Sequence, residues 1–126
     1  MIDVIDSNEF EPDDELFRAV KSMFYKNNGP HYTAFYSRNS DGLSVDWSKL
    51  TTPEQSLSRH DETYICMSSV SVEFVQNAIK ELFDHADLCI VHEPTDINPA
   101  HCLIKGQITQ GMAKQFARVC RVVLTR

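Results

Sequence analysis

The chain has 126 residues, of which 42% are hydrophobic, and it carries a formal net charge of −6. This length suffices for one domain with its own core, and the hydrophobic content excludes a wholly disordered chain. No apolar run approaches the roughly 20 residues that a membrane-spanning helix needs. The acidic N-terminus differs from the basic and then apolar start of a secretory signal. We therefore expect one cytoplasmic domain over residues 1–126, with residues 1–11 loosely ordered.

The first half of the chain predicts one helix followed by two extended segments. Over residues 16–25, apolar side chains recur at helical spacing after an acidic start, and a turn follows. Residues 31–37 are rich in aromatic and β-branched side chains, which favours a strand. A turn over residues 39–42 leads to the extended segment 43–47, in which Leu43 and Trp47 should anchor this connection on the core.

The middle of the chain predicts a short helix, a strand and a longer helix. Thr52, Pro53 and Gln55 form a capping-box start for a helix that ends near His60. Residues 63–67 predict a strand. Ser71 then caps an amphipathic helix that extends to about residue 83.

The last third of the chain predicts two inner strands and a final helix. Residues 88–91 are apolar on both faces, which is typical of a central strand, and residues 102–104 predict another strand. Thr109 caps the last helix, and residues 121–125 form either a short strand or a helical tail. Too few βαβ units are present for a doubly wound fold, so we predict an α+β domain: a mixed sheet of about four to five strands with three main helices packed on it.

The chain contains four cysteines, all in apolar segments: Cys66, Cys89, Cys102 and Cys120. Without an export signal or a Cys-x-x-Cys pair, buried free thiols are a better interpretation than disulfides. Zinc could use Cys89, His92, His101 and Cys102 as ligands. However, adjacent residues of a strand point to opposite faces, and the spacing matches no common zinc module. We therefore expect neither a metal nor a cofactor.

The most suggestive polar residues lie on the loop between the two inner strands. His92 ends the first of these strands and His101 starts the next, while Pro94, Asn98 and Pro99 make the loop rigid. Histidine exchanges protons near neutral pH, so this loop is a candidate catalytic or binding site. The structural interpretation, which we favour, is that Asn98 caps the turn and His101 hydrogen-bonds a backbone carbonyl to fix the loop on the core.

Two further sets of residues are weaker candidates. His31 starts the predicted strand 31–37, and by itself it indicates little. Lys114, Arg118 and Arg121 are spaced to share one face of the last helix, where they could meet phosphates or an acidic partner. A solvated outer face is the simpler interpretation, and we favour it. Because an acidic chain is a poor general nucleic-acid binder, we favour a protein partner over nucleic acid.

Three segments form an ordered set of landmarks across residues 31–120. They are Leu43-Ser-Val-Asp-Trp47, Thr52-Pro-Glu-Gln55 with Leu57 after it, and Pro94 followed by Asn98-Pro-Ala-His101, Ile104 and Gly106. Together they resemble a family of small, uncharacterised bacterial proteins. The resemblance implies a bacterial, stand-alone domain and adds no catalytic residue.

The sequence contains no assembled catalytic motif. It lacks a Gly-x-Ser-x-Gly sequence and any glycine-rich phosphate loop. Charge is also uneven, because residues 1–63 hold twelve acids against six bases and residues 64–126 hold six of each. We therefore predict a non-enzymatic binding or accessory protein that acts through a macromolecular partner. The alternative is a small histidine-dependent enzyme that acts on a nucleotide or nucleic acid, with His92 or His101 as acid or base.

Overall fold

The computed structural model describes residues 9–37, 42–84 and 86–126. In these ranges the chain forms a six-stranded sheet and a two-stranded ribbon. The ribbon pairs β2 (Tyr25–Lys26) with β3 (Gly29–Pro30). The strands of the sheet are β1 (Glu15–Lys21), β4 (Leu43–Trp47), β5 (Tyr64–Ser71), β6 (Cys89–His92), β7 (His101–Lys105) and β8 (Arg121–Thr125).

The strand order in the sheet is β6–β7–β4–β1–β5–β8, and every neighbouring pair is antiparallel. The α+β class is confirmed. The sheet is larger than the four to five strands expected, and it is antiparallel rather than mixed. Strand β1 lies inside the sheet where the sequence predicted a helix, and residues 43–47 and 121–125 both form strands of it.

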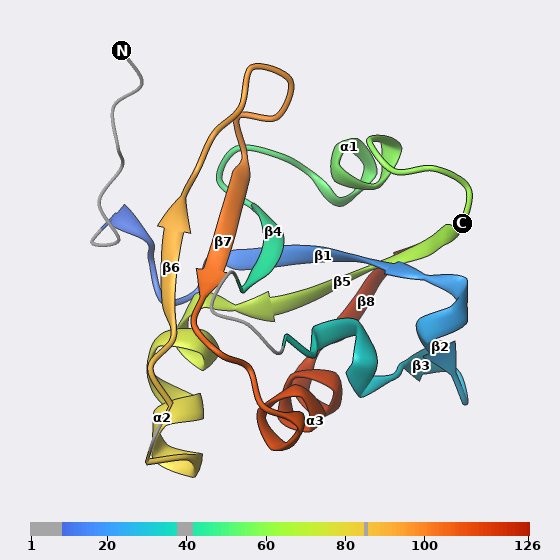
Figure 1. Cartoon of the computed structure of the whole chain (residues 1–126). Helices are drawn as coiled ribbons and strands as arrows, with labels where there is room; N and C mark the ends of the chain where they lie inside the picture. The colour runs from blue at the N-terminus through green and yellow to red at the C-terminus, as the bar shows by residue number, and fades with distance from the viewer. Residues whose placement is uncertain (1–8, 38–41, 85) are drawn as a thin grey trace.

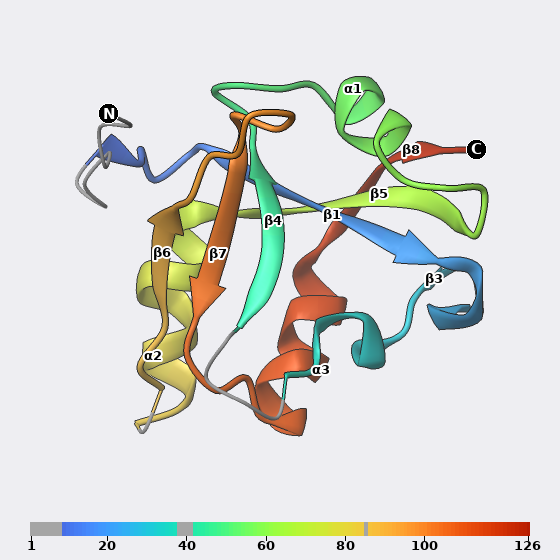
Figure 2. The same ribbon diagram turned by 45° about the horizontal axis from the view of Figure 1, so that its top comes forward.

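Three α-helices flank the sheet: α1 (Pro53–Ser58), α2 (Ile79–Leu82) and α3 (Gln110–Val119). A π-helical segment, Phe74–Ala78, leads into α2, and short 3₁₀ turns cover Ser22–Phe24 and Tyr32–Phe35. As Figures 1 and 2 show, α2 and α3 lie on one side of the sheet and α1 lies on the other. None of the helices in the described ranges is long and apolar enough to cross a membrane.

Three of the four predicted helix starts are confirmed by their capping hydrogen bonds. The Thr52 hydroxyl accepts from the backbone N–H of Gln55, and the Thr109 hydroxyl accepts from that of Met112. The Ser71 hydroxyl likewise accepts from the N–H of Phe74. These caps satisfy N–H groups that have no partner within the helix, so the local sequence is enough to specify where each helix begins.

The helix predicted over residues 16–25 is wrong, because this segment forms β1. Leu16 and Val20 project into the large core under α2 and α3, whereas Phe17 joins a smaller core with Leu57 and Met67 on the α1 side. The spacing of these apolar residues fits a helix face as well as the two faces of a buried strand. Pairing with β5 along the whole of β1 stabilises the strand.

Two strand predictions also need correction. Residues 31–37 form the 3₁₀ turn Tyr32–Phe35 and one isolated bridge between Ser37 and Ile108, since Ala34 and Phe35 turn into the core instead of alternating. The apolar strand predicted over residues 88–91 is β6, an edge strand paired only with β7. Residues 121–125 form a strand, β8, and not a helical tail.

Other predictions fall partly outside the described residues. Residues 1–8 and the turn at 39–41 lie there. Phe10, near the end of the segment expected to be loose, is buried with its ring centre 4.4 Å from that of Trp47. Leu43 and Trp47 are both buried, as predicted, so the connection before β5 is anchored on the core.

The cysteines differ in exposure, although all four are free thiols. Cys66 and Cys102 are buried, and Cys120 is partly buried. Burial raises the pKa of Cys102 to about 12 and that of Cys120 to about 11, and it also raises the pKa of Cys66. The prediction of burial is wrong for Cys89, because the edge strand β6 leaves this side chain exposed.

We expect iodoacetamide at pH 8 to modify Cys89 at least about tenfold faster than any other cysteine, because an accessible thiolate is the reactive form. Peptide mass spectrometry after timed quenching measures each site. The Cys89→Ser variant should resist modification until it is unfolded in urea. Modification of Cys66 or Cys102 in the native protein at the rate of Cys89 would contradict the structure.

The sheet is split between β1 and β4. These strands pair only at Leu16–Trp47 and Phe17–Asp46, whereas β1 pairs with β5 from end to end. Towards Leu43, β4 stays with β7 and turns away from β1 (Figure 2). Beyond the Phe17–Asp46 pair, β1 and β4 are no longer paired, and side chains fill the space between them.

Candidate functional site

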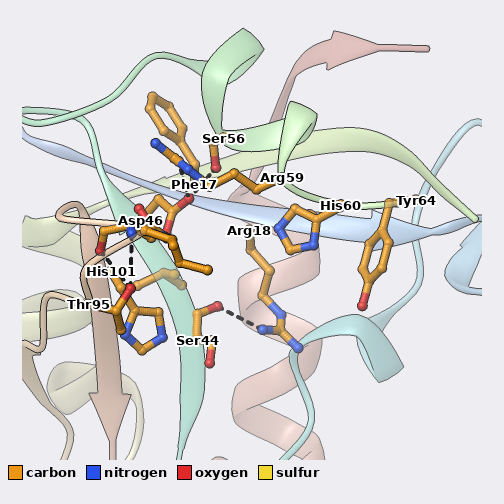
Figure 3. Close-up of a pocket in the computed structure, with 14 residues that line it drawn as sticks. Phe17, Arg18, Ser44, Asp46, Ser56, Arg59, His60, Tyr64, Thr95 and His101 are labelled. Carbon is orange, nitrogen blue, oxygen red and sulfur yellow. Dashed lines mark hydrogen bonds and ion pairs between the residues drawn. The ribbon is translucent and has the colours of Figure 1, made fainter. Parts of the chain in front are cut away.

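A cleft of about 490 Å³ opens where β1 and β4 separate. Figure 3 shows polar side chains from four parts of the chain around it. They come from β1, from β4, from α1 and the chain after it up to the start of β5, and from the loop between β6 and β7 up to the start of β7. The polar lining residues are Arg18, Ser44, Asp46, Ser56, Arg59, His60, Tyr64, Thr95, Asn98 and His101.

Asp46 is the centre of a buried hydrogen-bond network in this cleft. Its side chain accepts from the Ser56 hydroxyl at 2.5 Å and from the Asn98 amide at 2.9 Å. The same carboxylate forms an ion pair with Arg59, with 3.4 Å between Oδ2 and Nη1. Asp46 therefore joins β4 to α1 and to the loop before β7, and its charge is compensated by Arg59.

Asn98 has the structural role that the sequence predicted, and it adds a contact with the cleft. Its backbone N–H donates to the Thr95 hydroxyl at 2.9 Å, and its Oδ1 accepts from the N–H of Ala100 at 3.3 Å. Its side-chain Nδ2 donates to Oδ1 of Asp46. Asn98 thus fixes the turn and attaches the whole loop to β4.

His101 lines the cleft and also makes the predicted bond to a backbone carbonyl. Its Nδ1 lies 2.9 Å from the carbonyl oxygen of Glu93. Because a carbonyl only accepts, Nδ1 must carry the hydrogen, and Nε2 of the neutral ring is an unprotonated acceptor. The ring is therefore held in one tautomer beside the cleft.

His92 does not share this site. It is buried against the edge of Trp47, with ring centres 5.4 Å apart, and its Nε2 lies 2.8 Å from the carbonyl oxygen of Pro99. His92 pairs with Cys102 across β6 and β7, and both side chains face the core. His101 directly precedes Cys102 in β7, so its side chain points to the opposite face of the sheet.

The other residues proposed from the sequence also lie away from the cleft. His31 accepts from the N–H of Thr33 and caps the turn at Tyr32–Phe35. The prediction that Lys114, Arg118 and Arg121 share one face of the last helix is wrong. Helix α3 ends at Val119, and Arg121 lies on β8 in an ion pair with Glu15. Of the remaining pair, Lys114 lies over the ring of Tyr32 and Arg118 is exposed. Among the residues described, no cluster of three or more His, Cys, Asp or Glu side chains could hold a metal ion.

Arg18 is the functional candidate that the sequence did not reveal. It extends from β1 across the split, where Nε donates to the carbonyl of Ala34 at 2.6 Å and Nη1 to that of Ser44 at 2.9 Å. In the described parts of the chain, no carboxylate forms an ion pair with it. Burial lowers the pKa of Arg18 to about 10, so the guanidinium remains protonated at neutral pH. Its only signal in the sequence is a charged residue within the apolar run at residues 16–20.

His60 lines the cleft on the side formed by the chain after α1. Its ring lies next to that of Tyr64, with ring centres 4.5 Å apart. Burial lowers the pKa of His60, while Asp46 opposes this shift and Arg126 reinforces it. The imidazole is therefore neutral at pH 7. Arg126 also donates to the carbonyls of Leu57 and His60, which holds this wall in place.

No protein family, curated protein or solved structure matches this chain. The resemblance to small bacterial proteins therefore stays a prediction. Function has to be inferred from the chemistry of the cleft.

Proposed function

We propose that this protein binds a small anionic ligand in the cleft between β1 and β4, with a phosphate or carboxylate group at Arg18. The observation that supports this most strongly is the charge of Arg18, which only main-chain carbonyls compensate among the described residues. A partly buried charge without a counter-charge is unfavourable, and a bound anion would supply one.

The charge balance and the size of the cleft agree with this proposal. Asp46 and Arg59 neutralise one another, so Arg18 gives the cleft a positive charge within a protein of net charge −6. Local charge of this kind selects a ligand independently of the net charge. The volume of about 490 Å³ falls within the range of about 300–1,000 Å³ that is usual for small-molecule sites.

The proposal keeps the binding role that the sequence favoured but assigns it to a small ligand. The macromolecular partner and the cytoplasmic location stay predictions. The second candidate is the histidine-dependent enzyme. The observation that favours it is that Nδ1 of His101 is bonded to Glu93, which leaves Nε2 without a partner among the described residues beside the cleft. That atom could take a proton from a bound nucleotide or from water. His92 cannot fill this role because it faces the core.

The direct test is the Arg18→Met variant, which keeps the length of the stem and removes the charge. We expect its affinity for inorganic phosphate, measured by isothermal titration calorimetry, to fall at least about tenfold, because a charge-assisted hydrogen bond is lost. The control is Arg118→Met, which removes an exposed charge on α3, and it should bind like the wild type. Circular dichroism verifies that both variants are folded.

Equal affinity of Arg18→Met and wild type would overturn the proposal, as would absence of phosphate binding by the wild type. Arg18→Lys keeps a charge at the site and should retain part of the affinity. The enzyme would be favoured if the wild type converts an added nucleotide to product and His101→Gln binds that nucleotide without converting it.

A further inference from the structure

Ile97 is an exposed apolar side chain at the cleft. It is 88% exposed, more than any other large hydrophobic residue in the described ranges, and it nevertheless lines the cleft. A single exposed apolar residue is common on protein surfaces and by itself indicates nothing. What distinguishes Ile97 is that hydrogen bonds hold the loop that carries it.

The loop that carries Ile97 is held by hydrogen bonds within its turn and by one to Asp46 on β4. Thr95 and Asn98 exchange two backbone hydrogen bonds of 3.1 and 3.3 Å around the turn. The Asn98 amide then fixes the turn to Asp46. Ile97 is therefore presented in a fixed position at the rim although its own side chain is hardly packed. Preorganised apolar surface of this kind favours a ligand that covers it.

The cleft combines this apolar rim with further apolar surface. Phe17, Ala19 and Val45 line it from β1 and β4. A ligand in this space would contact hydrophobic surface and one positive charge at the same time. This combination is usual for small-molecule sites, where a few polar groups orient a mainly apolar ligand.

The groups around Arg18 favour phosphate over carboxylate. Nε and Nη1 of Arg18 already donate to carbonyls, which leaves Nη2 without a partner among the described residues. Figure 3 shows His60 and Tyr64 on the same side of the cleft as this guanidinium, on separate segments of the chain. Donors that approach from several directions match the three terminal oxygens of a tetrahedral phosphate better than the two oxygens of a planar carboxylate.

We infer that the ligand is a phosphate monoester that carries an apolar group, for which an aromatic ring is the probe used below. Its phosphate lies at Arg18 and its apolar group packs on Ile97. This inference rests on the proposed function and adds the chemical class of the ligand.

Isothermal titration with three probes tests the inference: inorganic phosphate, phenyl phosphate and benzoate. We expect the wild type to bind phenyl phosphate about tenfold more tightly than inorganic phosphate, because the ring buries apolar surface. Benzoate should bind more weakly than phenyl phosphate. In Ile97→Ala the advantage of phenyl phosphate should largely disappear while the affinity for inorganic phosphate is unchanged. Leu82→Ala, a second exposed apolar residue outside the cleft, should change neither affinity.

The outcomes separate this inference from the proposed function. If phosphate binds through Arg18 but phenyl phosphate gains nothing, or if Ile97→Ala has no effect, the ligand class is wrong and the anion site stands. Tighter binding of benzoate than of phenyl phosphate would also overturn the ligand class. If none of the three probes binds, both proposals fail.

Discussion

Asp46→Ala is expected to lower the free energy of unfolding by about 3 kcal/mol or more. Asp46 is 6% exposed, and its carboxylate accepts hydrogen bonds from Ser56 and Arg59 at α1 and from Asn98 on the loop before β7. Its removal leaves the Ser56 hydroxyl and the Asn98 amide without an acceptor, and it leaves Arg59 without its counter-charge. Loss of one member of a buried polar cluster costs more than the net value of the contacts, because the remaining groups stay desolvated.

Urea unfolding followed by tryptophan fluorescence measures this change, since the single tryptophan, Trp47, is buried next to Asp46 in β4. The control is Asp96→Ala, which removes an exposed carboxylate on the same loop as Asn98. Its stability should stay within about 0.5 kcal/mol of the wild type. An Asp46→Ala variant as stable as the Asp96→Ala variant would show that the network does not hold the cleft together.

Gly42→Ala is expected to destabilise the protein by about 3 kcal/mol. Gly42 has φ +79°, which a side chain strains, and a Cβ atom there would lie 1.8 Å from the carbonyl oxygen of Ile104. That carbonyl belongs to β7, where Ile104 pairs with Leu43. To remove the overlap, β4 would have to move away from β7 at the start of the strand that forms one wall of the cleft.

Gly29→Ala is the matched control, because a Cβ atom at Gly29 would meet nothing within 4 Å and the backbone there is not strained. We expect this variant to be unchanged or more stable by about 0.4–1 kcal/mol, because alanine reduces the entropy of the unfolded chain. The same urea titration compares the two variants. Equal stabilities would mean that the close approach of Gly42 to β7 is not present in solution.

Local chemistry explains which elements could be predicted from the sequence. The helices after Thr52, Ser71 and Thr109 begin with a side chain that caps neighbouring N–H groups, a contact between residues three apart. The Asn98 turn and the bond between His101 and the Glu93 carbonyl are contacts of the same loop. Such interactions need no information about the rest of the fold.

Partners distant in the chain explain the errors. Residues 16–25 have a spacing that suits a helix, but β1 has β4 and β5 on its two sides, and the hydrogen bonds of the sheet outweigh local preference. The apolar run at residues 88–91 suggested a central strand, yet only β7 pairs with it and Cys89 stays exposed. Neither result depends on the residues of the segment alone.

Part of the candidate site also follows from local sequence, and part depends on the tertiary structure. The sequence by itself determined the rigid loop that carries Asn98 and His101, because its turn residues bond to one another. Only the tertiary structure decided that this loop faces Arg18 and Asp46, since β1 and β4 pair at Leu16–Trp47 and Phe17–Asp46, far apart in the chain, and then separate. The alternation of side chains along paired strands turned His92 into the core and His101 into the cleft. The positive charge of Arg18 thereby became part of a site that no single segment of the chain specifies.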